Sequence, residues 1–438
     1  MFGLKLRIIV GAVLLPAALM AGQWYARQDI PDKCHRGSAM AYGRYSGTSY
    51  AWLMHGAVGN AYDLRRHNIT SGAWEPLAQM PQSPTKVGWG GSLAWVVDPY
   101  AYPETGWLFA LKGNYTREFW RYSPNTNAWT QMEPLPVGVQ VYDGGALCFG
   151  GFHMDGGLNY AYIYALIGNG SPRFFRYKFP VSPTRAPTLG TWTELPPFYM
   201  SLGVRGGGAL AWCPMTGMGY AKGLVFAQYG DNSQGLYKYN PAIAPPGGWS
   251  FVCLVDYAIG GGGAMTTEQG GDSVWVFPGR SQRQWWVYDA RTGIFRYFTS
   301  DVEKTWWADQ RDGAAICHDG SYLYGELGYN AAATTTFKRF SLSGAGEQGG
   351  GGQGGGFDQA PAVTVSCGAN EHRFRFGAPF SGSVTMVVYD ATGRLETQVT
   401  GDASSGLTWG HNGAAPGVYF YSVETASARA TGKVLVAR

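Results

Sequence analysis

The residues of this 438-residue chain that could carry out chemistry lie beside short glycine turns. They combine carboxylates that exchange protons, guanidinium groups that donate hydrogen bonds, and aromatic rings whose apolar faces stack on sugar rings. We expect an inner set at Arg36, Trp89, Tyr142, Asp143, Arg205 and Arg311, and an outer set at Asn114, Tyr115, Asn169, Asp231, Asn232 and Arg280. This mixture favours recognition of a glycan or another polar polymer. The competing interpretation is that most of these are ordinary turn residues.

Motifs of the common enzyme classes are absent from the sequence. The seven histidines form no HExxH pair, and the chain has neither a G-x-S-x-G elbow nor a phosphate-binding P-loop. We therefore expect no metal and no cofactor, and no catalytic residue can be assigned. Buried free thiols are favoured over disulfides, which remain the alternative, at Cys34, Cys148, Cys213, Cys253, Cys317 and Cys367.

A repeat positions these residues. A tight glycine turn followed by small and apolar residues recurs six times, at a spacing of about 50 to 60 residues. The turns contain Gly37, Gly90, Gly144, Gly207, Gly262 and Gly313. Such a period is typical of blades arranged around an axis, and small residues are expected because inner strands crowd together there.

Each full repeat also contains three further strand-like runs. An apolar run ends in glycine and a polar residue, as at Gly113 and Asn114, and a run alternating aromatic and basic residues follows, as at 119–122. A tryptophan such as Trp129 opens the last run. Four strands in each unit are the number expected of a propeller blade.

The third-strand tyrosine, the turn and the fourth-strand tryptophan, as in residues 122–129 (YSPNTNAW), resemble the repeats of Kelch-type β-propellers. The resemblance covers residues 24 to 343 and implies an all-β fold with a six-bladed Kelch-like β-propeller. The fifth unit departs from the pattern, with Ile294 and Phe295 where a tryptophan is expected. Kelch-type galactose oxidases carry copper, but they have seven blades and a set of ligands that cannot be assembled from this sequence.

The sixth repeat lacks a fourth strand, and a matching segment lies at the other end of the chain. Trp24 precedes Pro31 by seven residues, the same spacing as from Trp74 to Pro81. We expect this N-terminal strand to complete the sixth blade, because that would close the ring and remove two open sheet edges.

Residues on both sides of the predicted propeller, 23–343, indicate export. Residues 1–22 have a positively charged start, an apolar stretch from Ile8 to Met20 and a small-residue end, as in a signal peptide; an uncleaved anchor is the alternative. No later segment could cross a membrane as a helix, so we expect no transmembrane span in the mature chain. Residues 344–356 are nearly all glycine, the composition of a flexible linker.

Residues 357–438 have the strand pattern of a small immunoglobulin-like β-sandwich. Motifs at 387–395, Trp409, 417–421 and 433–438 resemble the C-terminal sorting domains of type IX secretion cargo and the related immunoglobulin-like domains of flagellar hook-cap proteins. The resemblance implies contact with outer-membrane secretion machinery and removal of this domain. The sequence WGHNG from Trp409 onward departs from the family's Trp-Asp-Gly, so a plain stalk domain is the alternative.

Composition limits the remaining function classes. Aromatic residues at 15% and charged residues at 14% fit an extracellular all-β protein, and a net charge of +4 is too small to indicate nucleic-acid binding. We expect a secreted or cell-surface bacterial protein that binds a glycan, a polymer or a surface protein. Two alternatives stay open: a carbohydrate-active hydrolase, lyase or oxidase that uses Asp143, Arg205 and Arg311, and a structural surface-layer component.

Overall fold

A computed structural model describes the fold of residues 23–56, 64–182, 189–215, 223–243, 247–267, 271–280, 285–298, 312–328, 335–341, 363–367, 371–376, 382–390, 394–411, 413–415, 417–425 and 429–436. The predicted signal peptide and glycine linker lie outside these ranges. The chain divides into two compact units, residues 1–287 with 296–350 and residues 288–295 with 351–438. Within the described ranges, no helix has the length and apolar character needed to cross a membrane.

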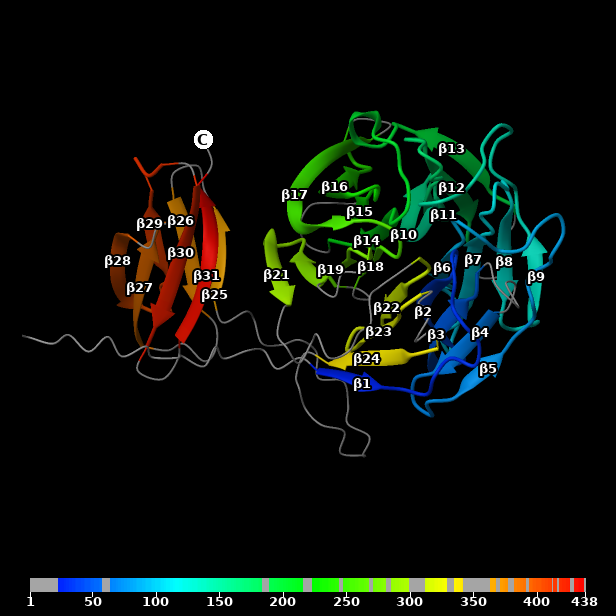
Figure 1. The fold of residues 1–438 in the computed structure, drawn as a ribbon, viewed down its shortest axis with the longest axis horizontal. Helices are drawn as coiled ribbons and strands as arrows, with labels where there is room; N and C mark the ends of the chain where they lie inside the picture. Colours follow the sequence, from blue (N-terminus) through cyan, green and yellow to red (C-terminus); the bar gives the residue numbers. More distant parts are fainter. Residues whose placement is uncertain are drawn as a thin grey trace, which may run out of the picture. The chain divides into compact units, whose positions relative to one another are not determined.

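Six four-stranded antiparallel sheets are described in residues 23–341, and all but residues 288–295 of these strands belong to the first unit (Figure 1). Five of the six described sheets follow the order of the chain: β2 (Ala39–Tyr45), β3 (Thr48–Met54), β4 (Leu64–Asn68) and β5 (Trp74–Pro76); β6 (Ser92–Val97), β7 (Gly106–Leu111), β8 (Phe119–Ser123) and β9 (Ala128–Gln131); β10 (Ala146–Asp155), β11 (Leu158–Leu166), β12 (Phe174–Pro180) and β13 (Thr191–Leu195); β14 (Ala209–Cys213), β15 (Leu224–Gln228), β16 (Ser233–Asn240) and β17 (Gly248–Ile259); and β18 (Ala264–Thr267), β19 (Ser273–Phe277), β20 (Trp285–Asp289) and β21 (Ile294–Phe298). The sixth sheet consists of β22 (Ala315–His318), β23 (Leu323–Glu326), β24 (Phe337–Ser341) and β1 (Gln23–Ala26). One short 3-10 helix, η1 (Tyr199–Ser201), follows β13.

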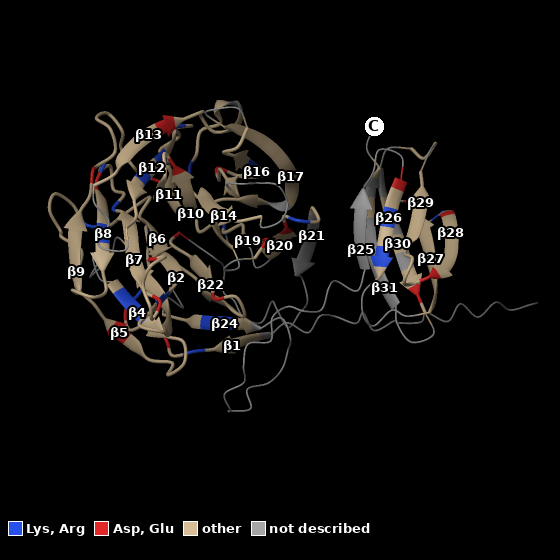
Figure 2. Ribbon diagram, turned by 180° about the vertical axis from the view of Figure 1, so that it is seen from behind, with Lys and Arg blue, Asp and Glu red and all other residues tan. Residues whose placement is uncertain are grey.

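One edge strand of each sheet lies at the centre of the unit: the first strand in chain order in five sheets, and β22 in the sixth. These inner strands neighbour one another in a closed order, β2, β6, β10, β14, β18, β22 and back to β2. Figure 2 shows the sheets from behind, with acidic and basic residues scattered over the described strands. Sheets that radiate from a ring of inner strands are the arrangement of a β-propeller.

A pair of aromatic rings repeats in the outer strands and explains the spacing seen in the sequence. A third-strand ring packs against the fourth-strand tryptophan with centroids 5.0 to 5.3 Å apart in Tyr122–Trp129, Tyr177–Trp192, Tyr239–Trp249, His67–Trp74 and Phe340–Trp24. His67 therefore takes the tyrosine position in the first sheet, and Phe340 takes it in the sixth.

The N-terminal strand completes the sixth sheet, as the sequence predicts. β1 pairs antiparallel with β24 and places Trp24 opposite Phe340. The fourth-strand tryptophans also form a repeated hydrogen bond to the preceding sheet. Each indole N–H donates to the backbone carbonyl that lies four residues after the fourth-strand tryptophan of that sheet. The pairs are Trp129–Ala78, Trp192–Glu133 and Trp249–Pro196. Trp74 donates in the same way to Gln28, four residues after Trp24, at 2.9 Å. Trp24 is thus equivalent to the other fourth-strand tryptophans.

The second unit contains two antiparallel sheets. One consists of β25 (Val363–Cys367), β26 (Glu371–Phe376) and β29 (Leu407–Gly410), and the other of β28 (Leu395–Asp402), β27 (Ser383–Tyr389), β30 (Gly417–Glu424) and β31 (Arg429–Val436). Buried side chains of both sheets share one core, in which Phe374 and Tyr421 meet edge to face at 5.0 Å. Two sheets that pack on a common core form a sandwich.

The cysteines of the described residues confirm the expectation of free thiols. Cys34, Cys148, Cys213 and Cys317 are buried and Cys253 is partly buried, and all five are unbridged. The side chain of Cys367 lies outside the described set. Burial raises the pKa of the Cys148 and Cys317 thiols, so these groups stay protonated and behave as small apolar side chains.

Candidate functional site

The candidate site lies at the end of the channel where the inner strands begin. Each turn there contains a glycine with positive φ: 86° at Gly37, 82° at Gly90, 88° at Gly144, 91° at Gly207, 84° at Gly262 and 89° at Gly313. A Cβ on Gly144 would lie 2.2 Å from the carbonyl oxygen of Arg205 in the next sheet. Glycine is therefore required by the backbone conformation and by contact with the neighbouring turn. The sequence predicted small residues here from crowding alone.

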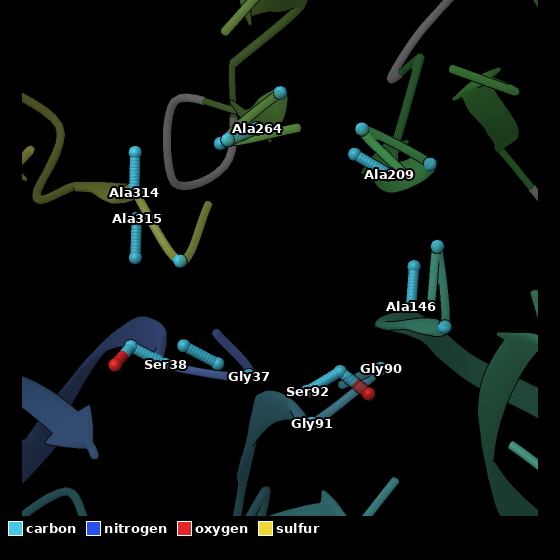
Figure 3. Close-up of a pocket in the computed structure, with 18 of the residues that line it drawn as sticks. Gly37, Ser38, Gly90, Gly91, Ser92, Ala146, Ala209, Ala264, Ala314 and Ala315 are labelled. Atoms are coloured by element: carbon cyan, nitrogen blue, oxygen red, sulfur yellow. The ribbon is translucent and has the colours of Figure 1, made fainter. Parts of the chain in front are cut away.

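Small residues from all six sheets line the cavity at this mouth (Figure 3). Gly37 and Gly90, from the turns before β2 and β6, and Ala146, Ala209 and Ala264, from β10, β14 and β18, surround this opening. The cavity has a volume of about 140 Å³. These residues leave space and offer few side-chain groups for binding, so recognition depends on the rim.

The rim is formed by the position immediately before each turn glycine. Its occupants in chain order are Arg36, Trp89, Asp143, Gly206, Gly261 and Asp312. The two glycines make room for the carboxylates. The Gly206 N–H donates to Asp143 Oδ2 at 3.0 Å, and a Cβ on Gly261 would lie 1.9 Å from Asp312 Oδ1. Both carboxylates thus reach over the glycine half of the rim.

The other half of the rim carries a row of stacked groups. The Arg36 guanidinium lies 4.1 Å from the centre of the Trp89 ring. Trp89 stacks on Tyr142 with centroids 5.6 Å apart, and Tyr142 stacks on Tyr115 at 3.8 Å. Arg36, Trp89 and Tyr142 are half-buried, whereas Tyr115 is 49% exposed. The row therefore runs from the channel mouth to the outer surface and ends in an open aromatic face.

Asp143 and Asp312 differ in their environment. Arg36 Nε contacts Asp312 Oδ2 at 2.8 Å, so Asp312 has a charged partner. Burial raises the pKa of Asp143 above its ordinary value, and the charge of Asp312 raises it further. The Gly206 N–H and the charges of Arg36 and Arg205 oppose this shift without cancelling it. Asp143 is thus the carboxyl of this pair that takes up a proton more readily than usual.

The outer set of predicted residues has mainly a structural role. Asn114, Asn169, Asp231 and Arg280 all have positive φ, between 50° and 58°. Their backbone N–H groups donate to the inner turns, for example Asn114 to the Trp89 carbonyl at 2.9 Å. Asparagine and aspartate tolerate this left-handed conformation better than most residues, which explains the repeated pairs of glycine and a polar residue. The interpretation as turn residues accounts for these positions.

Two outer side chains nevertheless reach the mouth. Tyr115 ends the stacked row, and Asp231 pairs with Arg205 at 3.6 Å between two exposed groups. An exposed pair of this kind contributes little to stability. Asp231 thus places a carboxylate beside Arg205.

The structure brings most of the inner set together and adds one residue. Arg36, Trp89, Tyr142 and Asp143 share the mouth, and Arg205 stands next to it. Arg311 lies outside the described residues. Asp312 was missed, although its position before Gly313 matches that of Asp143 before Gly144. Aligning the six turns on their glycines would have found it.

Among the described residues, no group of three or more His, Cys, Asp or Glu side chains could hold a metal ion. No protein-family model matches the sequence, and no curated protein does. Solved structures do resemble the fold. A fungal alcohol oxidase in complex with copper is 11% identical over 95% of this chain and 99% of its own, with a TM-score of 0.46. An alpha-L-arabinofuranosidase from Fusarium graminearum is 10% identical over 73% of this chain and 99% of its own, also at 0.46.

A third similar structure is PorZ, a bacterial surface component of the type-IX secretion system of Porphyromonas gingivalis. It is 12% identical over 93% of this chain and 60% of its own, with a TM-score of 0.36. These neighbours are β-propeller-like. At such low identity no site residue carries over from them, and the function has to be argued from the mouth itself.

Proposed function

We propose that this chain is an exported six-bladed Kelch-like β-propeller that binds a neutral glycan at the bacterial cell surface through the mouth described above. One observation carries the proposal: the row of Arg36, Trp89, Tyr142 and Tyr115 begins at the rim of a small cavity and is flanked there by two carboxylates, Asp312 on Arg36 and Asp143 next to Tyr142. Aromatic rings beside fixed hydrogen-bonding groups are the combination that suits a sugar ring, because the apolar face of the sugar stacks while its hydroxyls bond.

The charges around the mouth favour a neutral ligand. Among the described residues of the rim and of the two predicted sets, three arginines, Arg36, Arg205 and Arg280, are matched by three aspartates, Asp143, Asp231 and Asp312. A balanced rim gives no net attraction for a polyanion, whereas sugar hydroxyls can accept from guanidinium groups and donate to carboxylates. The same balance argues against nucleic acid as the ligand.

The polar groups are held in place before a ligand arrives. Arg36 is fixed by the ion pair to Asp312 and by the ring of Trp89, and Asp143 is fixed by the Gly206 N–H. Side chains that are already ordered lose less rotamer entropy on binding, which raises affinity. We expect the mouth to change little in conformation when a glycan binds.

A glycan array probed with the mature chain tests the proposal. Neutral oligosaccharides should be retained, and retention should not require an acidic sugar. Retention of acidic glycans alone would contradict the charge argument. No retention at all would overturn glycan binding in favour of a structural surface-layer role.

The difference between the two carboxylates supports a second candidate, hydrolysis of the bound glycan. A carboxyl with a raised pKa next to an ionised one is the arrangement that glycosidases use for general acid and base. Asp143 would then donate the proton, and Asp312, held by Arg36, would be the second carboxyl group. Release of reducing sugar from array ligands, abolished in Asp143→Asn, is the expected result of this candidate. Binding without release would exclude it.

We infer that residues 1–22 are a signal peptide, 23–343 the propeller, 344–356 a linker, and 357–438 an immunoglobulin-like domain that contacts outer-membrane secretion machinery. The sequence motifs of the last segment and its two-sheet sandwich support this assignment. Mass spectrometry of the protein recovered from culture medium should show a chain that begins near residue 23 and ends before 357. A secreted chain that retains residue 438 would favour a stalk.

A further inference from the structure

A second cavity lies toward the opposite ends of the inner strands. The residue five positions after each turn glycine contributes to it: Tyr42, Trp95, Phe149, Trp212, Thr267 and His318. All six line one cavity of about 260 Å³. Leu93, Leu147 and Leu210 line both this cavity and the polar mouth, so the two spaces lie along one channel. The polar mouth leaves this ring of large side chains unexplained.

Glycines in neighbouring strands make room for the two indoles. A Cβ on Gly43 of β2 would lie 2.1 Å from the Trp95 ring, and one on Gly151 of β10 would lie 2.6 Å from the Trp212 ring. Trp95 also stacks on Trp52 with centroids 5.2 Å apart. Glycine within a strand lowers stability and often marks the close approach of another group. These positions therefore hold the indoles flat against the preceding sheet.

The cavity is uncharged. None of its sixteen lining residues, all within the described ranges, is Asp, Glu, Lys or Arg. His318 is 3% exposed, and its Nδ1 accepts a hydrogen bond from the Gly320 N–H at 2.9 Å. Burial lowers the pKa of His318 to about 3, so it is neutral under physiological conditions. A charged ligand would lose its hydration here without gaining a charged partner.

We propose that this cavity binds a neutral aromatic small molecule of one or two fused rings. The half-buried rings of Tyr42, Phe149 and Trp212 offer stacked and edge-to-face contacts. A cavity of about 150 Å³ in another protein holds benzene, so about 260 Å³ has room for a second ring. The Thr267 hydroxyl supplies a hydrogen-bonding partner for a single phenolic group.

A sugar fits this cavity less well than it fits the polar mouth. Its many hydroxyls would need partners, and the lining hydroxyls are those of Thr266, Thr267 and Tyr42. The Tyr42 hydroxyl is already hydrogen-bonded to Ser49 at 3.0 Å. Sugar hydroxyls without partners would be desolvated at a cost. The inference is independent of glycan binding, because no residue of the stacked row or of the carboxylate pair lines this cavity.

Titration calorimetry of the full mature chain with 2-naphthol at pH 7 tests the proposal. We expect one binding site, and binding of the charged analogue 2-naphthoate weaker by about tenfold or more. Thr267→Trp fills the cavity and should weaken 2-naphthol binding by about tenfold or more, as should Trp212→Ala. Circular dichroism confirms that each variant is folded. Trp89→Ala, at the polar mouth, should leave 2-naphthol binding unchanged.

Three results would overturn the proposal. They are the absence of 2-naphthol binding up to about 1 mM, equal affinity for the charged analogue, or a folded Thr267→Trp variant that binds as well as the parent. Trp212→Ala alone is less decisive because it removes a ring that fills space. The Thr267→Trp variant is also applied to the glycan array. Because the substitution blocks this cavity and leaves the polar mouth intact, its glycan retention reports on the polar mouth alone.

Discussion

Single residues decide the geometry of the mouth, and the turn glycines matter most. Each inner strand begins after a glycine with positive φ, and most of these glycines lie against a carbonyl of the next turn. The contact is repeated from sheet to sheet, so one added methyl group would displace two neighbouring turns. The rim residues Arg36, Trp89 and Asp143 are carried on these same turns. The positions of these rim residues therefore depend on the absence of a Cβ atom at the turn glycines.

Replacing Gly144 by alanine should destabilise the protein by about 3 kcal/mol or more, because the new Cβ combines unfavourable φ with a backbone clash. Gly138→Ala is the matched control: its φ is 83°, close to the 88° of Gly144, but nothing lies within 4 Å of its Cβ position. The control should lose only about 1 kcal/mol. Urea unfolding measures both. Equal losses would show that contact between turns contributes nothing.

Asp143 should give glycan binding a pH dependence. The ionised carboxylate accepts hydroxyl hydrogen bonds, and burial together with Asp312 raises its pKa above the ordinary carboxyl range. Affinity should therefore fall as the pH drops through this raised pKa, at a higher pH than for an unperturbed aspartate. Asp143→Asn should bind more weakly at neutral pH and show a flatter profile. A parent profile that stays flat down to pH 4 would contradict this role.

Five of the six described sheets of the first unit contain one aromatic pair between their outer strands, and the first sheet has a histidine in it. His67 replaces the tyrosine that packs against the fourth-strand tryptophan in the second, third and fourth sheets, and it is fully buried between Trp74 and Phe337. Burial, aided by the charge of Arg27, lowers the pKa of His67 from its ordinary value near 6.5 to about 4. Between pH 6.5 and 4, the imidazole of His67 is therefore neutral in the folded state and protonated in the unfolded chain.

The stability contributed by neutral His67 is complete above pH 6.5 and is lost as the pH falls toward 4. His67→Phe keeps a ring against Trp74 and removes the titration. The variant should gain up to about 3 kcal/mol relative to the parent between pH 6.5 and 4. Unfolding by urea at several pH values measures the difference. His318 is present in both proteins, so its titration contributes equally to both and does not affect the difference in stability. A stability difference that stays constant between pH 6.5 and 4 would show that His67 is not the titrating group.

Much of the element pattern could be predicted from the sequence, because tryptophan and glycine recur in register. The pairing of β1 with β24 followed from the seven-residue spacing of Trp24 and Pro31. The position of Asp312 before a turn glycine could be found in the same way, but its contact with Gly261 of the preceding turn could not, because neighbouring turns meet only once the inner strands are placed side by side. For the same reason, the sequence did not predict that Gly43 and Gly151 make room for the rings of Trp95 and Trp212. Packing between sheets leaves no local pattern in the sequence.

The whole first unit depends on pairing between its two ends. β1 comes from the start of the chain and β24 from the end of the predicted propeller, and Trp24 packs on Phe340 and Trp285. Opening this contact would expose strand edges on both sides. Loss of one tryptophan should therefore weaken the unit as a whole rather than a single sheet.

Trp24→Ala should lower the free energy of unfolding by about 3 to 5 kcal/mol, the range for removing a buried tryptophan. Ala26→Ser on the same strand is the control, because Ala26 is exposed and should change stability by less than about 0.5 kcal/mol. Urea unfolding with hydrogen exchange shows where protection is lost. Loss confined to the sixth sheet would contradict a closed ring held by its ends.

Glycan binding at the polar mouth is the central claim, and calorimetry on Trp89→Ala tests it most directly. The parent protein is titrated with the neutral oligosaccharide that the array retains best, alongside Trp89→Ala and the control Tyr102→Ala, whose ring is 99% exposed in the β6–β7 loop. Trp89→Ala should bind at least about tenfold more weakly, since it removes the ring on which Arg36 and Tyr142 are ordered. Tyr102→Ala should bind like the parent. Unchanged affinity in a folded Trp89→Ala variant would contradict the account.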